Sequence, residues 1–190
     1  MPATVLDPKT ALVVIDLQKG IAAFPTIHPI QGVIANSARL ADAFRQKGLP
    51  VVLVTVTHSP DGADRLRSRT ETPARSIPLS PDFSVLVPEL AAEPNDLLIV
   101  KRQGNAFFGT ELDLQLRRRG VTGIVLTGVS TSNGVDNTAR AAYELTYNVT
   151  FAIDAITDLD PAAHEYILKK SFPRLGEIDS TDAILALLPK

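Results

Sequence analysis

The 190-residue chain carries a formal net charge of −2, which gives no electrostatic basis for binding nucleic acid or anionic membranes. No apolar run approaches the roughly 20 residues that cross a bilayer, and the first residues do not resemble a secretion signal, so we expect a cytoplasmic protein. The chain contains no cysteine, which excludes disulfides, thiolate metal ligands and cysteine nucleophiles.

Apolar runs of strand length alternate with amphipathic helical patterns along most of the chain. Strands are predicted at 11–15, 51–56, 97–100, 124–126 and 149–153, with a short sixth near 176–178. Helices are predicted at 33–47, 111–119, 133–145 and 181–188. Because such alternation builds a parallel sheet with helices on both faces, we predict one domain over residues 1–190. Its fold would be α/β, a three-layer αβα arrangement with a six-stranded, mostly parallel sheet.

One long segment, 58–95, interrupts this alternation. It contains prolines at positions 60, 73, 78, 81, 88 and 94 and shows little sustained periodicity. Segments of this length in compact domains are typically lids, binding loops or subunit contacts. A surface excursion without a function is the alternative.

Polar residues follow the predicted strands, and these are the candidates for a site. Ligands of open parallel sheets bind beyond the carboxyl ends of the strands, near the point where the strand order reverses. In chain order the candidates are Asp16 and Gln18, Thr57 and His58, Lys101 and Arg102, the segment 128–134, and Asp154.

Asp16 and Lys101 are the candidates for chemistry. Each comes directly after a run of apolar residues, so partial burial would raise the pKa of the Asp16 carboxyl and a nearby cation would lower it. Asp16 could then transfer a proton, while Lys101 could keep it ionised or stabilise negative charge on a substrate. A purely structural ion pair between two strand ends is the alternative.

The segment 128–135 joins a strand to a helix and is rich in small and hydroxylated residues. Such residues cap a helix and leave its first backbone N–H groups free to bind an anion or an oxyanion. An ordinary helix cap is the other interpretation.

Four blocks of the sequence together resemble the isochorismatase-like hydrolases, a family that includes nicotinamidases, carbamoyl amidohydrolases and isochorismatases. The blocks are 14–18, 100–101 together with 106–112, 124–131 and 138–140. The resemblance implies a Rossmann-like fold, a catalytic Asp16 and Lys101, and a cis peptide bond between Val129 and Ser130. The residues expected to bind substrate are Gln18, His58, Phe107, Val129, Ser130, Thr131, Asn133 and Gly134.

Gly134 stands where the amidase branch of this family has its nucleophilic cysteine. Glycine at this position is similar to the isochorismatase branch, in which the aspartate protonates a vinyl ether and water attacks the oxocarbenium carbon, releasing pyruvate. The stretch 101–105 reads Lys-Arg-Gln-Gly-Asn, whereas isochorismatases resemble Lys-Trp-Arg-Tyr there.

The leading hypothesis is a hydrolase that acts on a small, anionic metabolite, with Asp16 as acid or base and Lys101 as its electrostatic partner. The rival is a catalytically silent family member that binds a small ligand or acts through its oligomer. A third possibility, a nicotinamidase-type amidase, would need the missing cysteine.

No metal and no cofactor are expected. Nicotinamidases bind zinc through an Asp-x-His unit after the second strand, and Val56 takes the aspartate's place before His58. The family usually forms dimers or tetramers, so the resemblance implies a homodimer or homotetramer with a small-molecule substrate.

Overall fold

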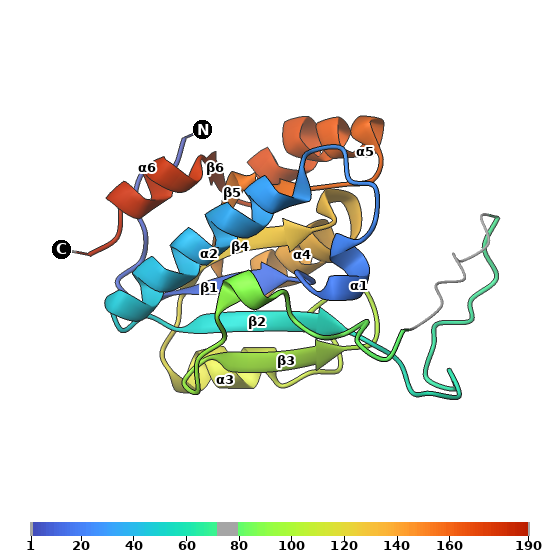
Figure 1. Cartoon of the computed structure of the whole chain (residues 1–190). Coiled ribbons are helices and arrows are strands. Elements are labelled where there is room, and N and C mark those ends of the chain that lie inside the picture. The colour runs from blue at the N-terminus through green and yellow to red at the C-terminus, as the bar shows by residue number, and fades with distance from the viewer. Residues whose placement is uncertain (1, 72–79, 190) are drawn as a thin grey trace.

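A computed structural model describes residues 2–71 and 80–189 of the chain (Figure 1). Its six strands form one sheet in the order β3-β2-β1-β4-β5-β6, and each neighbouring pair is parallel. The strands are β1 (Thr10–Ile15), β2 (Val51–Val56), β3 (Leu97–Lys101), β4 (Gly123–Val129), β5 (Asn148–Thr157) and β6 (Glu177–Asp179).

The sheet separates two hydrophobic cores. Successive strand residues point to opposite faces, so Ala11, Val13 and Ile15 of β1 enter one core and Leu12 and Val14 enter the other. The first core is closed by α3 (Leu112–Arg118) and α4 (Asp136–Glu144), and the second by α2 (Ile30–Gln46) and α6 (Thr181–Ala186). Helices therefore cover both faces, which confirms the predicted three-layer αβα fold.

Helix α2 shows how the apolar spacing of the sequence produces this packing. Its buried residues include Val33, Leu40, Ala41 and Phe44, a spacing that places them along one face of a helix. The helix ends before Gly48, whose φ of +64° is a left-handed conformation that glycine adopts without steric cost.

Strand β5 is longer than its apolar run predicted. The sequence indicated an end at residue 153, but the strand continues to Thr157, and its register against β4 shifts between Leu126 and Gly128. Asp154 therefore lies inside the strand, and its Oδ1 accepts hydrogen bonds from the backbone N–H and the hydroxyl of Thr181. Assigning Asp154 to the strand end was wrong, and Asp158 occupies that place.

Several short helical elements were not predicted. They are α1 (Lys19–Ala22), η1 (Pro88–Leu90) and the consecutive elements α5 (Pro161–Tyr166), η3 (Ile167–Ser171) and η4 (Phe172–Arg174). The predicted helix at 133–145 begins within η2 (Thr131–Val135) and continues as α4. Elements as short as α1 and η1 show no helical period in the sequence. In the described part of the chain, no helix is long and apolar enough to cross a membrane.

The segment after β2 leaves the sheet edge and later returns to it (Figure 1). On its return, Val85 O accepts from Lys19 N at 2.8 Å and Phe83 O accepts from Gly20 N at 3.0 Å. A Cβ on Gly20 would lie 2.0 Å from the Phe83 ring, so the close approach of this ring requires glycine. The returning segment thus packs against the residues that follow β1.

Candidate active site

A cavity of about 700 Å³ lies at the carboxyl ends of the strands, where the strand order reverses between β1 and β4. This is the position at which open α/β sheets bind ligands, and the volume suits a small molecule. The lining residues come from the ends of β1, β2, β3, β4 and β5 and from the segment after β2. No group of three or more histidine, aspartate or glutamate side chains arranged to hold a metal occurs within residues 2–71 and 80–189.

Asp16 directly follows β1 and faces this cavity. Its φ of 53° is left-handed, a conformation that aspartate and asparagine tolerate better than most residues. Only 6 % of the residue is exposed. One carboxylate oxygen, Oδ2, is bound to Lys101, while Oδ1 is buried with no partner among the described residues. Oδ1 is therefore available to a ligand.

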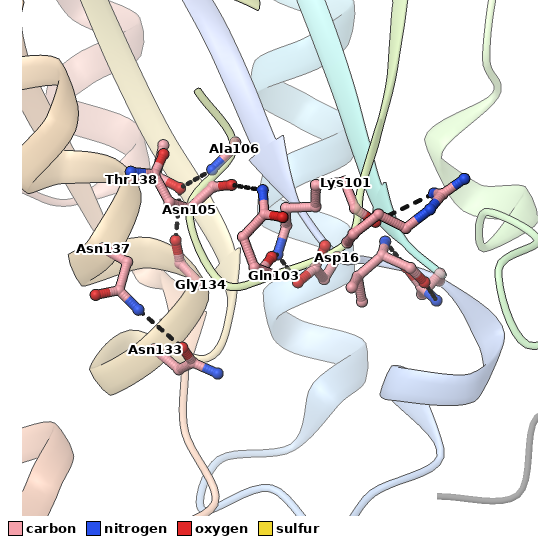
Figure 2. A network of polar contacts seen from close by, with 12 residues as sticks. Asp16, Lys101, Gln103, Asn105, Ala106, Asn133, Gly134, Asn137 and Thr138 are labelled. Carbon is pink, nitrogen blue, oxygen red and sulfur yellow. Dashed lines mark hydrogen bonds and ion pairs between the residues drawn. The ribbon is translucent and has the colours of Figure 1, made fainter. Parts of the chain in front are cut away.

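Lys101 ends β3, two strands away from β1, and its long side chain crosses that distance (Figure 2). Its ammonium donates to Asp16 Oδ2 at 2.7 Å and to the Gln103 carbonyl at 3.1 Å. The residue is 2 % exposed, so water does not screen the pair. The structure thus brings together the two residues expected to carry the chemistry.

Burial and the ion pair with Lys101 have opposite effects on the pKa of Asp16. Desolvation by burial is the larger effect and raises the pKa of the Asp16 carboxyl, while the charge and hydrogen bond of Lys101 lower it. The net result is a pKa of about 6. A carboxyl with such a pKa holds a proton under mildly acidic conditions and can still release it near neutrality.

The loop after β4 forms the opposite wall of the cavity. Val129, Ser130, Asn133 and Gly134 all line it. The peptide bond between Val129 and Ser130 is cis, at the position that the sequence resemblance indicates.

The free anion cradle expected in this loop is partly occupied by the protein itself. The N–H of Ser132 donates to Asp158 Oδ2 at 2.6 Å, and Asp158 Oδ1 accepts from the N–H groups of Leu159 and Asp160. The Ser132 amide therefore cannot serve a substrate while this bond is intact. Sequence reasoning missed Asp158 because it placed the end of β5 too early.

Gly134 has no room for a side chain. A Cβ there would lie 2.8 Å from Ile15 Cγ2, 3.0 Å from the Val129 carbonyl oxygen and 3.4 Å from Asp16 Oδ2. Real Cβ atoms essentially never approach another heavy atom as closely as 2.8 Å. The residues around this position therefore pack closely against a glycine, next to the Asp16 carboxylate.

The loop that follows β3 is tied to helix α4 (Figure 2). Thr138 Oγ1 donates to the Gly134 carbonyl at 2.7 Å and accepts from the Ala106 N–H at 3.1 Å. Asn133 is held by Asn137, whose Nδ2 donates to Asn133 Oδ1 at 2.9 Å. The Ala106–Thr138 bond thus ties the loop that follows Lys101 to the wall that contains Gly134.

Three residues expected to bind substrate do not line the cavity. Gln18 is fully buried: its Nε2 donates to the carbonyls of Val56 and Phe83, and its Oε1 accepts from Val56 N–H. Phe107 belongs to a hydrophobic core and stacks on Tyr147. Neither side chain lines the cavity, because the direction of a side chain at a strand end and the burial of an aromatic ring depend on tertiary packing.

Thr131 is the third of these residues. It is buried, and its hydroxyl lies 2.7 Å from Nδ1 of His164. The His164 ring in turn contacts His28 edge-on, with ring centroids 5.0 Å apart. Burial is the main cause that lowers the pKa of His164, so a neutral ring and the Thr131 hydroxyl form a structural contact behind the loop.

His58 lines the cavity, as expected. Its Nδ1 lies 3.8 Å from Asp64 Oδ1, too far for a hydrogen bond. Burial, assisted by the neighbouring cations Arg65 and Arg102, lowers the pKa of His58 although Asp64 raises it. The ring is therefore neutral at neutral pH and can offer one nitrogen as donor or acceptor.

The cavity also contains residues that sequence reasoning did not assign to a site. The segment 58–95 contributes Arg65, Leu66 and Phe83, and α1 with its surroundings contributes Ile21 and Phe24. The sequence predicted a lid, a binding loop or a subunit contact for the segment 58–95. Because this segment shows no periodicity, the sequence could not indicate which of its residues face the cavity.

Comparison with known proteins identifies the family. A family model for the isochorismatase domain matches residues 10–183. The uncharacterized isochorismatase family protein YwoC of Bacillus subtilis is 43% identical over 179 residues, which cover 93% of each chain. Ureidoacrylate amidohydrolase RutB of Variovorax paradoxus is 29% identical over 178 residues, covering 81% of this chain and 71% of its own.

Solved structures give the same result. An isochorismatase family protein from Burkholderia thailandensis superposes with a TM-score of 0.94 at 43% identity, covering 97% of each chain. N-carbamoylsarcosine amidase from Thermoplasma acidophilum gives a TM-score of 0.73 at 26% identity, over 92% of this chain and 97% of its own. The sequence resemblance and the predicted isochorismatase-like fold are confirmed, and the chain belongs to the isochorismatase family.

Proposed function

We propose that this chain hydrolyses a small, anionic metabolite by acid catalysis at Asp16, without a covalent intermediate on the protein. The observation that carries the proposal is the buried Asp16–Lys101 pair at the cavity wall, in which Oδ1 of the carboxyl has no hydrogen-bond partner among the described residues. A desolvated carboxyl beside a cavity is a group suited to proton transfer.

Vinyl-ether hydrolysis is the reaction that such a site supports best. Protonated Asp16 gives its proton to the terminal carbon of the C=C bond, and the ether-bearing carbon becomes an oxocarbenium ion. Water adds to this carbon and returns a proton to the Asp16 carboxylate. The resulting hemiketal then breaks into a ketone and an alcohol, so each turnover consumes one water and regenerates the acid.

Lys101 has a positioning and electrostatic role in this scheme. It holds one carboxyl oxygen of Asp16 at 2.7 Å, which fixes the orientation of the carboxyl group and leaves Oδ1 without a partner among the described residues. Its charge stabilises the carboxylate that forms when the proton leaves. His58, Val129, Ser130, Asn133 and Gly134 would contact the substrate, since they line the same cavity.

The packing around Gly134 supports chemistry without a thiol. Even a Cβ at this position would overlap Ile15 Cγ2. A cysteine side chain would therefore not fit here unless the neighbouring residues moved, so the site differs from an amidase site by more than the loss of one thiol. The amidohydrolase name of the RutB relatives therefore does not transfer to this chain, and we expect no ammonia release from amides.

A binding protein without turnover is the second candidate. It is favoured by the same cavity, which can hold a small molecule although the chain has no cysteine to act as a nucleophile. Enol-pyruvyl ethers, aromatic acids and amides would be screened for thermal stabilisation of the protein, and each mixture would then be analysed for pyruvate and ammonia. Pyruvate release supports the proposal, stabilisation without any product supports the binding protein, and ammonia release contradicts both.

A further inference from the structure

Three of the residues that line the cavity each have a buried polar atom without a hydrogen-bond partner among the described residues. These atoms are Asp16 Oδ1, His58 Nδ1 and Arg65 Nε. Buried polar groups in native proteins are nearly always satisfied, and each exception calls for an explanation. Three exceptions around one cavity point to a ligand that supplies the missing partners.

Among the cations that line the cavity, Arg65 alone has no carboxylate partner in the described part of the chain. Lys101 is paired with Asp16 at 2.7 Å, and Arg102 Nε is paired with Asp64 Oδ2 at 2.7 Å. The positive charges of Lys101 and Arg102 are thus already compensated. Arg65 is the residue whose charge remains available to an anion.

The Arg65 side chain packs against the backbone of the turn that precedes it. Gly62 has a φ of +64°, and a Cβ on it would lie 3.3 Å from Arg65 Nε and 3.4 Å from Cδ, so the arginine stem packs closely over the glycine. Arg67 supports this turn, because its Nη2 donates to the Gly62 carbonyl at 3.1 Å. A side chain restrained in this way loses less conformational freedom when it binds a ligand.

We propose that Arg65 binds the carboxylate of the substrate and thereby determines its class, a small and largely apolar carboxylic acid. This inference rests on the proposed function, in which the reactive group of the same molecule reaches Asp16. A guanidinium matches the planar, two-oxygen geometry of a carboxylate. Neutral His58 offers a further hydrogen bond, and the apolar lining suits the rest of the molecule. That lining includes Ile21, Phe24, Leu66, Phe83 and Leu159.

Binding of benzoate and benzamide, which share a shape but differ in charge, tests this inference. In isothermal titration calorimetry the wild-type protein should bind benzoate more tightly than benzamide. Arg65→Met should weaken benzoate binding at least tenfold and leave benzamide binding unchanged, while Arg65→Lys should retain part of the preference. Arg69→Met, which removes the same charge from an exposed position of this segment outside the cavity lining, should behave as wild type.

Two results would overturn the inference: a wild-type protein with no preference for benzoate, including one that binds neither compound, or an Arg65→Met protein that keeps the preference. Both assays measure binding, so their outcome is separate from that of the proposed reaction. If Asp16→Asn still hydrolyses the substrate, the acid mechanism is wrong while the role of Arg65 stands. If Asp16→Asn is inactive and Arg65→Met binds benzoate as tightly as wild type, the acid mechanism stands and the role of Arg65 is wrong.

Discussion

The Asp16–Lys101 pair combines two opposing effects in one residue contact. Burying an ion pair costs desolvation energy, and the attraction between the charges offsets this cost only in part. Burial dominates at Asp16, whose pKa is raised to about 6. The carboxyl therefore holds its proton to a higher pH than an exposed aspartate does, which is the property that an acid catalyst needs.

We predict that turnover falls as the pH rises through about 6. The pKa of Asp16 is raised, from 3.8 to about 6, so the protonated, active form is populated below that pH and is lost above it. A kcat profile between pH 4.5 and 8 checks this expectation. A kcat that instead rises through this range would show that the ionised carboxylate is the working form and that Asp16 acts as a base.

A second prediction concerns Gly134→Cys. The new side chain would overlap Ile15 Cγ2 and the Val129 carbonyl, and overpacking of this kind typically costs about 1–3 kcal/mol. We expect a lower midpoint in chemical denaturation and no gain of amidase activity. Gly32→Cys is the matched control, because nothing lies within 4 Å of a Cβ at this position in α2, and it should not destabilise. A stable Gly134→Cys protein that releases ammonia from amides would disprove the thiol-free interpretation.

At the scale of secondary-structure elements, contacts between segments far apart in the sequence position the site. β1 supplies Asp16 and β3 supplies Lys101, and β2 lies between them. Gln18 joins the residues after β1 to β2 and to the segment that returns near Phe83. The geometry of the pair thus depends on bonds made by residues that do not touch the cavity.

Gln18→Ala should therefore act as a structural change rather than as the loss of a substrate contact. It would remove the side-chain bonds to the Val56 N–H and carbonyl and one of the two hydrogen bonds that the Phe83 carbonyl accepts, and we expect a loss of about 2–4 kcal/mol in the free energy of unfolding. Urea denaturation measures this loss. Gln46→Ala, at an exposed position near the end of α2, should stay within about 0.5 kcal/mol of wild type. If Gln18→Ala were as stable as wild type, the structural role would be excluded.

The sequence predicted the regular elements well and their ends less well. Apolar runs located β1 to β5, because a strand that packs inside a sheet is largely apolar, and the short sixth strand was expected only as the completion of the alternating order. They could not show that β5 continues past Asp154 after a register shift, so Asp158 was missed. The sequence placed Asp16 and Lys101 at strand ends on the same edge of the sheet, whereas the burial of Gln18 and Phe107 and the position of Arg65 depend on tertiary packing.

At the scale of the whole molecule, we propose that residues 1–190 act as one domain within a homodimer or homotetramer. Large apolar side chains are exposed on the edge strand β3 and in the loop that follows it. Leu98 and Val100 of β3 are 60 % and 50 % exposed, and Phe108 in the loop is 72 % exposed. Clusters of exposed apolar side chains are typical of subunit contacts.

Light scattering coupled to size-exclusion chromatography tests this assembly. We expect a mass of two or four times the 20.4 kDa of the chain. Leu98→Asp combined with Val100→Asp should shift the mass towards the monomer, because charges would be buried in the contact. A 20.4 kDa particle for the wild-type protein would refute the oligomer.

The most direct test of a cysteine-free acid mechanism is the rate of pyruvate release from an enol-pyruvyl ether by wild type and Asp16→Asn, measured side by side at pH 6. Asparagine keeps the shape of the side chain and tolerates the left-handed backbone of this position, but it cannot donate a carboxylic proton. The acid mechanism predicts a loss of at least about 100-fold in a variant whose circular dichroism spectrum is unchanged. A folded Asp16→Asn protein that releases pyruvate as fast as wild type would contradict it.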